Sequence, residues 1–279
     1  MEHFYFLIAF LLFCLIVLFK YLKTGKLKYR FKFSVRNYYL LVSVFLIGVV
    51  AKSLHDRSWF LPVLFLILCV MGVVGETLFS VWWRVFYKKN FWVYKVETLA
   101  HAYTSLLNFL PWGVGGALLV SFAEWLVPLL PPHFKTYHVV SLGVPFWQIF
   151  ILFLFLGSGI QLSIWIIFTG HVGRNFKFKK ATFWNYLFFI SPFLLSLAAC
   201  CLIFSWSFLL IAAVFAAVGG SAEYLFGKAT QFFISKKLWS YSYCSFDNGH
   251  FTPLALAGFS IAGFLSWATA YALHSFLKY

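Results

Sequence analysis

Long uninterrupted apolar stretches are the feature that most restricts what this chain can fold into. Of its 279 residues, 63% are hydrophobic and only 10% are charged, whereas soluble domains carry about 25% charged residues. A run of about 20 apolar residues is long enough to cross a bilayer as a helix. The sequence therefore predicts an all-α integral membrane protein and excludes a soluble globular domain, a disordered chain and a disulfide scaffold.

Eight apolar segments fit this description, although the second is short and must borrow residues from its flanks. The third and seventh are long enough to tilt or to protrude into water. The first has no basic region before it and no small-residue cleavage site after it, so we predict a membrane helix rather than a signal peptide. The predicted spans are 4–19, 38–51, 59–87, 106–126, 146–168, 183–204, 206–235 and 251–277.

Basic residues are distributed unevenly between the two sides of these spans. Eighteen Lys and Arg residues lie beside the connections that follow spans 1, 3, 5 and 7, and only four lie on the other side. Such a bias places the basic side in the cytoplasm, which predicts a cell (inner) membrane protein with both termini on the outer side. Since these residues flank apolar spans, we expect them to contact anionic lipid headgroups and expect no nucleic-acid partner.

The sequence contains no pattern typical of a metal, cofactor or nucleotide site. None of the five cysteines has CxxC spacing, and no HxxH or HExxH occurs, so we expect no metal and no cofactor. Gly227-Lys228-Ala229 lacks the first glycine and the Ser or Thr of a P-loop. The composition leaves open a homo-oligomer or a partner membrane subunit.

The two halves of the chain are similar when one is shifted by 147 residues. Between residues 58 and 94, ten of 37 positions are then identical, where about three or four would be expected by chance. Glu76 falls on Glu223 in this comparison. Because each half holds four spans, we predict two parallel four-helix repeats, residues 1–127 and 146–279, joined by a proline-rich outer connector, 128–145.

The similarity extends in both directions with small shifts. Asn37-Tyr38 matches Asn185-Tyr186 with one residue of slip. Downstream, Asn108 takes the place of His250 after a gap of five residues, and each precedes a Phe-x-Pro sequence. In parallel repeats of this kind, binding sites commonly lie between the halves.

Glu76 and Glu223 are the strongest functional candidates. Each lies 17 residues after the tryptophan that opens its helix, about 25 Å along it and inside the membrane. Ionisable side chains cost about 2.5–3.5 kcal/mol at such depths, so they indicate a partner or a function. A pair near the axis would suit proton coupling, cation binding or acid–base chemistry. The alternative is a structural carboxylate that bonds a Tyr, a Trp or a helix end.

The other candidates lie near the inner ends of these helices. Asn108 and His250 could cap a helix or bind substrate, and His101 and His250 are candidate acid–base residues. Aromatic residues follow both glutamates at equal spacing and suit an interfacial belt or a substrate site at headgroup level. These aromatic residues are Trp92, Tyr94, Trp239 and Tyr241.

The second half also resembles the CmpB-like family, which is described as ABC-transporter permeases and includes small four-helix relatives. The resemblance covers residues 220–260, with a weaker echo in 73–116. It rests on Glu223-Tyr224, Gly227, Leu238-Trp239-Ser240-Tyr241-Ser242 and Phe246. The family has Asp where Ser240 stands here. The resemblance implies a permease with a glutamate in the membrane.

Three functions follow as hypotheses. The first is a permease-like protein that moves a small or lipid-like substrate, with the glutamate pair binding a proton or a cation. The second is an integral membrane enzyme that acts on a lipid or isoprenoid by Glu/His acid–base chemistry. The third is a subunit or scaffold of a membrane complex.

Overall fold

A computed structural model describes residue 38 and residues 46–51, 53–55, 58–129, 144–234 and 236–277. The predicted first span, half of the second and most of the outer connector lie outside these residues. So do the basic residues between the first two spans.

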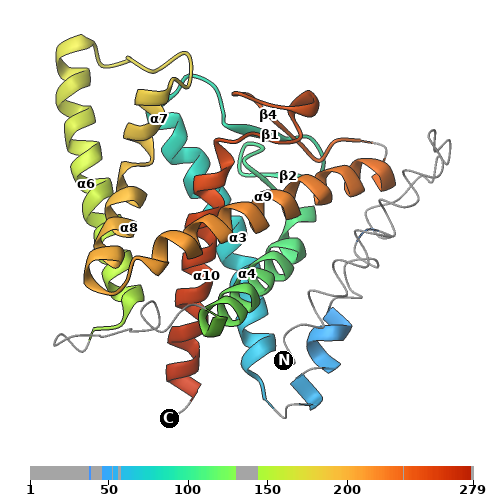
Figure 1. The fold of residues 1–279 in the computed structure, drawn as a ribbon. Coiled ribbons are helices and arrows are strands. Elements are labelled where there is room, and N and C mark those ends of the chain that lie inside the picture. Colours follow the sequence, from blue (N-terminus) through green and yellow to red (C-terminus); the bar gives the residue numbers. More distant parts are fainter. Residues whose placement is uncertain are drawn as a thin grey trace.

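Five helices of the described part are long and apolar enough to cross a membrane. They correspond to the predicted spans 3, 4, 5, 7 and 8, which confirms a helical protein of the membrane type. These helices are α3 (Phe60–Phe86), α4 (Phe109–Leu129), α6 (Phe146–Val172), α9 (Ser207–Ile234) and α10 (Ala255–Leu277), shown in Figure 1. The 3-10 turn η1 (Leu106–Asn108) leads into α4, and η2 (Asp247–Gly249) lies before α10.

The ends of α6 show how the sequence limits a span. The helix begins directly after Pro145, whose extended backbone at φ −68° and ψ 151° cannot continue a helix backwards. It ends at Val172, and the next residue, Gly173, caps it with φ 126°. A glycine with positive φ is a common helix terminator because it has no Cβ to clash.

The predicted span 183–204 is not one straight helix. It consists of α7 (Phe183–Phe189) and α8 (Ser191–Ile203), which meet at an angle of 64°. Pro192 in the first turn of α8 has no N–H to donate to the preceding turn. Gln161 of α6 donates instead to the carbonyl oxygens of Phe188 and Phe189, at 3.0 Å for Phe189. This buried amide satisfies carbonyl groups at the break, as a membrane interior requires.

Two pairs of short strands lie at the end of the molecule where α3 and α9 finish. β1 (Trp92–Tyr94) follows α3 and pairs antiparallel with β4 (Trp239–Tyr241), which follows α9 (Figure 1). β2 (Thr98–Leu99) and β3 (Thr104–Ser105) form a second antiparallel pair. The residues expected as an interfacial belt are therefore the residues of a strand pair that joins two helix ends.

Val93 and Ser240 lie opposite each other in this pair, which makes the contact testable. In a Cys244→Ser background, we expect Val93→Cys/Ser240→Cys to be joined by a short bis-methanethiosulfonate, a bifunctional reagent that forms a disulfide with each thiol and releases methanesulfinate, because strand partners lie about 4.5–5.5 Å apart. Mass spectrometry of the digested protein would detect the linked peptides. Val93→Cys/Ser275→Cys is the control, since Ser275 lies near the far end of α10. Equal cross-linking of both pairs would contradict the strand contact.

The connections from the strands to the next helices share an uncommon backbone conformation. Positive φ is rare outside glycine, yet both connections contain it at matching positions. These residues are Glu97, Ala100, His101 and Ala102 in the first connection, and Cys244, Asp247, Asn248 and Gly249 in the second. Each member of the second set lies 147 residues after its counterpart.

Close glycine contacts hold the helix pairs α3–α4 and α9–α10 together. A Cβ added to Gly72 of α3 would lie 2.0 Å from Trp112 Cγ of α4. A Cβ added to Gly219 of α9 would lie 2.7 Å from Phe259 Cβ of α10. Small residues allow helices to approach this closely in membranes. In both pairs, an aromatic side chain of the second helix packs against the glycine of the first.

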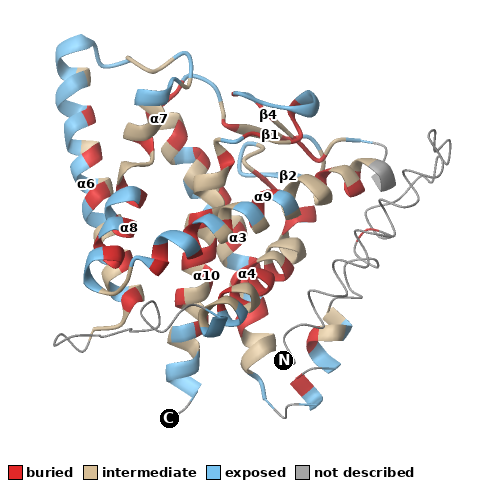
Figure 2. Ribbon diagram, viewed as in Figure 1, coloured by how far each residue is buried: buried red, intermediate tan, exposed pale blue. Residues whose placement is uncertain are grey.

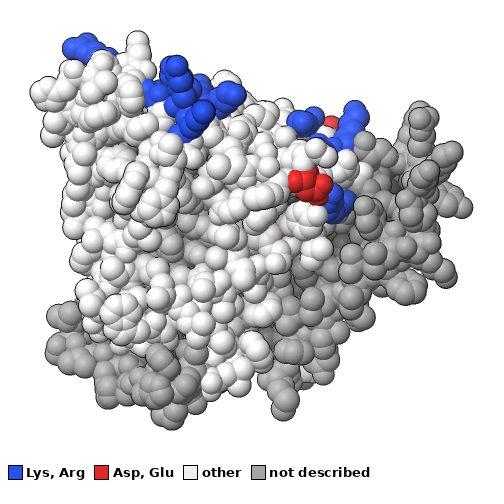
Figure 3. All heavy atoms as spheres, turned by 45° about the horizontal axis from the view of Figure 1, so that its top comes forward, with Lys and Arg blue, Asp and Glu red and all other residues white. Residues whose placement is uncertain are grey.

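The surfaces of the described part agree with a membrane protein. Figure 2 shows buried residues where α4 and α10 meet the other helices, and an exposed outer face on α6. That face carries Phe155, Ile166 and Ile167, which are 61–74% exposed. Figure 3 shows that Lys and Arg side chains gather at the end of the molecule that carries the strands and the α6–α7 connection.

Candidate functional site

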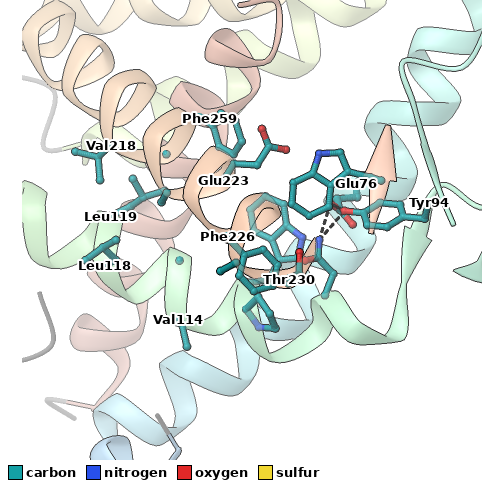
Figure 4. Close-up of a pocket in the computed structure, with 18 of the residues that line it drawn as sticks. Glu76, Tyr94, Val114, Leu118, Leu119, Val218, Glu223, Phe226, Thr230 and Phe259 are labelled. Carbon is teal, nitrogen blue, oxygen red and sulfur yellow. Dashed lines mark hydrogen bonds between the residues drawn. The ribbon is translucent and has the colours of Figure 1, made fainter. Parts of the chain in front are cut away.

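A pocket lies between α4 and α9. Its empty volume is about 1130 Å³, which includes the part that is open to solvent. Apolar side chains form most of its wall, and both membrane glutamates line it. Figure 4 shows Leu118 and Leu119 of α4 at the end away from Glu76 and Tyr94. Ligand sites are typically concave, mostly apolar and equipped with few polar groups, and this pocket has that character.

Glu76 is held by three side chains that donate to its carboxylate. Oε1 accepts from the Tyr94 hydroxyl and from Asn108 Nδ2, the latter at 2.8 Å. Oε2 accepts from Thr104 Oγ1 at 2.5 Å. Since the donors come from β1, β3 and η1, this carboxyl group ties the strand layer to α3. The arrangement fits the structural carboxylate that the sequence left open for Glu76.

Glu223 has a different environment although its sequence position matches. Its Oε1 accepts from the Tyr241 hydroxyl, as Glu76 does from Tyr94. Its Oε2 is buried and has no hydrogen-bond partner among the described residues. A buried acceptor without a partner costs about 1–3 kcal/mol, so the pocket contains a polar atom suited to a bound molecule.

Two indole groups add donors to the same pocket. Trp112 of α4 and Trp239 of β4 both line it. Trp112 interacts with the carboxyl group of Glu76, whereas Trp239 Nε1 has no hydrogen-bond partner in the described part of the chain. Trp239 is only 4% exposed and stacks on Phe226, with 6.1 Å between ring centroids. The pocket therefore combines one unpaired acceptor, Glu223 Oε2, with one unpaired donor, Trp239 Nε1, inside an apolar wall.

The two tyrosines beside the glutamates act as permanent donors. Burial, and then the carboxyl groups of Glu76 and Glu223, raise the pKa of Tyr94 well above its usual range. The same causes, burial first, raise the pKa of Tyr241. Both phenols therefore keep their protons at physiological pH, and each donates to its own glutamate.

Four of the candidates from the sequence do not line the pocket. Trp92 donates through Nε1 to the carbonyl oxygen of Tyr103 at 2.6 Å and stacks on Phe79. Tyr241 reaches only the Oε1 side of Glu223. His101 is an exposed loop residue with φ 58°, and His250 is considered next.

His250 is buried outside the pocket and bonds Gln231 of α9. Burial, and then the charges of Lys228 and Lys237, lower the pKa of this imidazole, so it is neutral at pH 7. Its contact with Gln231 joins the connection before α10 to α9 and is a packing contact. The structure thus brings together Glu76, Glu223, Tyr94, Asn108 and Trp239, and leaves both histidines elsewhere.

Three further residues of the site do not stand out in the sequence. Trp112 and Tyr38 line the pocket, and Thr104 completes the donors to Glu76. The 147-residue shift could have indicated Trp112, since it pairs Trp112 with Phe259 as the rings that meet Gly72 and Gly219. Nothing in the sequence distinguishes Thr104 from other loop hydroxyls.

Comparisons with protein-family models, with curated proteins and with solved structures found no match to this chain. The resemblance to the CmpB-like family therefore stays a prediction. Among the described residues, no cluster of three or more His, Cys, Asp and Glu side chains could hold a metal ion.

Proposed function

We propose that the chain is built from two similar halves of four spans each, related by an offset of 147 residues. The glutamate contacts support this, because Glu76 accepts from Tyr94 and Glu223 accepts from Tyr241 at the same spacing. The glycine-to-ring contacts of the two helix pairs and the positive-φ loops recur at the same offset.

Side chains in the connections add further support. Ser105 Oγ donates to the carbonyl oxygen of Val96 at 2.7 Å. Thr252 Oγ1 donates to the carbonyl oxygen of Tyr243 at 2.9 Å. Both the donors and the acceptors are 147 residues apart, so two connections of unlike sequence are held by corresponding bonds.

The preceding predicted spans have a corresponding contact as well. The Tyr38 hydroxyl donates to the carbonyl oxygen of Leu107 at 2.6 Å, and the Tyr186 hydroxyl donates to that of Leu254 at 2.5 Å. The sequence matches Tyr38 with Tyr186 after one residue of slip, and Leu107 lies 147 residues before Leu254. Tyr38 and Tyr186 thus make corresponding contacts with the segments that lead into α4 and α10.

The strand pair supports a two-fold relation between the halves. The Lys95 N–H donates to the Leu238 carbonyl at 2.8 Å, and the Ser242 N–H donates to the Phe91 carbonyl at 2.9 Å. Exchanging each residue for its counterpart converts one bond into the other. A two-fold axis between the halves produces such reciprocal bonds, and parallel repeats require an axis of this kind along the membrane normal.

These contacts revise one detail of the sequence comparison. The offset of 147 holds through the connections, so it places Asn108 opposite Ala255 rather than His250. The different contacts of Asn108 and His250 agree with this, since Asn108 donates to Glu76 and His250 bonds Gln231.

The function that this geometry supports best is a permease-like protein that binds a small or lipid-like substrate between its halves. The unpaired Glu223 Oε2 inside a largely apolar pocket is the observation that carries the proposal. Glu223 would contact a proton or a cation during transport, whereas Glu76 holds the fold. An acid–base enzyme draws less support, because His101 and His250 lie outside the pocket.

The experiment compares cells that contain wild-type protein, Glu223→Gln or no protein. We expect mass spectrometry of lipids and metabolites to show at least one compound whose distribution depends on the wild-type protein. Glu223→Gln should abolish that difference while the protein stays in the membrane, because the amide keeps the size but loses the charge. Glu124→Gln is the matched control, since it neutralises an exposed acid on α4.

Two outcomes would count against transport. If Glu223→Gln leaves every distribution unchanged from wild type, the carboxylate has no part in moving substrate. If it changes only the abundance or assembly of the protein, a subunit or scaffold is favoured.

The orientation belongs to the same proposal. The gathering of Lys and Arg side chains at the strand end supports placing that end in the cytoplasm of a cell (inner) membrane. Both termini would then lie outside, and the basic end would contact anionic lipid headgroups. The resemblance to the CmpB-like permeases agrees with this proposal.

A further inference from the structure

We propose that the substrate of the pocket is an organic cation, an ammonium group carried on a long apolar chain. This inference rests on the proposed function and names its substrate class. The charge of the pocket is the first reason. Two carboxyl groups line it, and none of its described lining residues is Lys, Arg or His. Three protein donors stabilise the Glu76 carboxylate, whereas an ionised Glu223 would require a compensating charge, and here the ligand would supply it.

The contact atom for the ammonium group is Glu223 Oε2. Glu76 has no such role, because three protein donors already occupy its carboxylate. Glu223 accepts only from Tyr241, and its other oxygen is buried without a partner in the described part. A charge-assisted hydrogen bond from an ammonium group would give Glu223 Oε2 the donor that it lacks.

Aromatic rings around the carboxyl groups favour a cation over a neutral head group. Cations are attracted to the faces of aromatic rings, most strongly to tryptophan. The pocket concentrates six aromatic side chains: Tyr38, Tyr94, Trp112, Phe226, Trp239 and Phe259. Several come from elements far apart in the sequence, so the fold assembles an aromatic enclosure around an acidic group.

The remaining groups of the pocket indicate which other chemical groups the ligand carries beside its ammonium group. The indole N–H group of Trp239 is unpaired among the described residues and would donate to an oxygen next to the ammonium group. Leu118, Leu119 and Val218 line the part of the pocket away from Glu76 (Figure 4). This wall suits a hydrocarbon chain. The class is therefore a long-chain amine, with an amino alcohol as its best-fitting member.

The test measures binding of radiolabelled dodecylamine to the full chain in phosphatidylcholine nanodiscs, with empty nanodiscs as background. We expect saturable binding that 1-dodecanol and dodecanoate do not displace at equal concentration. Glu223→Gln should weaken it by about tenfold or more, since a hydrogen bond to a charged group is lost. Glu76→Gln, which keeps an acceptor for Tyr94, should retain most of the binding in its folded fraction.

A second probe tests the indole donor of Trp239. 2-Amino-1-dodecanol should bind more tightly than dodecylamine to the wild-type protein, and Trp239→Phe should remove that advantage while keeping a ring. Equal binding of dodecylamine to wild type and Glu223→Gln would overturn the inference, as would its displacement by dodecanoate or the absence of saturable binding. The proposed function is judged separately, because the distribution experiment in cells uses none of these probes.

Discussion

Gly72→Ala is expected to lower the melting temperature of the protein by several degrees. The added Cβ would lie 2.0 Å from Cγ of Trp112, and neighbouring atoms of that side chain lie within 2.4 Å. Since the tryptophan is held between α3 and the pocket, α3 and α4 must separate to admit a methyl group. Overpacking of this kind costs about 1–3 kcal/mol, which corresponds to about 2–4 °C of melting temperature per kcal/mol in a chain of this size.

Gly75→Ala on the same helix provides the matched control for this prediction. Nothing lies within 4 Å of a Cβ built at Gly75, and alanine favours a helix over glycine by about 0.5–1 kcal/mol. This variant should therefore unfold at the wild-type temperature or slightly above it. Thermal unfolding of both purified variants in the same detergent decides the matter. Equal melting temperatures would contradict the α3–α4 contact.

Glu76→Ala is expected to destabilise the protein far more than Glu223→Ala. The first change leaves the buried hydroxyl groups of Tyr94 and Thr104 without their acceptor and leaves Asn108 with only the Tyr94 oxygen. The second removes the partner of one donor, Tyr241. At about 1–3 kcal/mol for each buried group left unpaired, the loss should be several kcal/mol for Glu76 and near 1–3 kcal/mol for Glu223.

The same pair of variants tests the division of roles between the two glutamates. Unfolding of both in one detergent, followed by circular dichroism against denaturant, gives the two losses directly. Losses of similar size, or a larger loss for Glu223→Ala, would contradict the assignment of Glu76 as the structural carboxylate.

The helices were predictable because their physical requirement is simple. An apolar run must be long enough to cross the bilayer, and the ends of α3, α6, α9 and α10 fall within a few residues of the predicted spans. The break between α7 and α8 was missed, because it depends on a distant amide, Gln161, that satisfies the freed carbonyl groups. The apolar pattern of residues 183–204 cannot predict a hydrogen-bond donor that lies on another helix.

The candidate site was predictable in part for a similar reason. Acids are rare in this chain, so Glu76 and Glu223 stand out, and the spacing to Tyr94 and Tyr241 points to their donors. Their unlike environments could not be predicted. The difference arises from Thr104 and Asn108, which lie 28 and 32 residues from Glu76 and reach it only through the fold.

The central claim is that the pocket between α4 and α9 binds a substrate through Glu223 and not through Glu76. Native mass spectrometry of wild type, Glu76→Gln and Glu223→Gln, purified side by side from the same membranes, tests it most directly. The account predicts a small molecule bound to the wild-type protein and to folded Glu76→Gln, and lost from Glu223→Gln. Retention of that molecule by Glu223→Gln, or its loss from folded Glu76→Gln alone, would contradict the account.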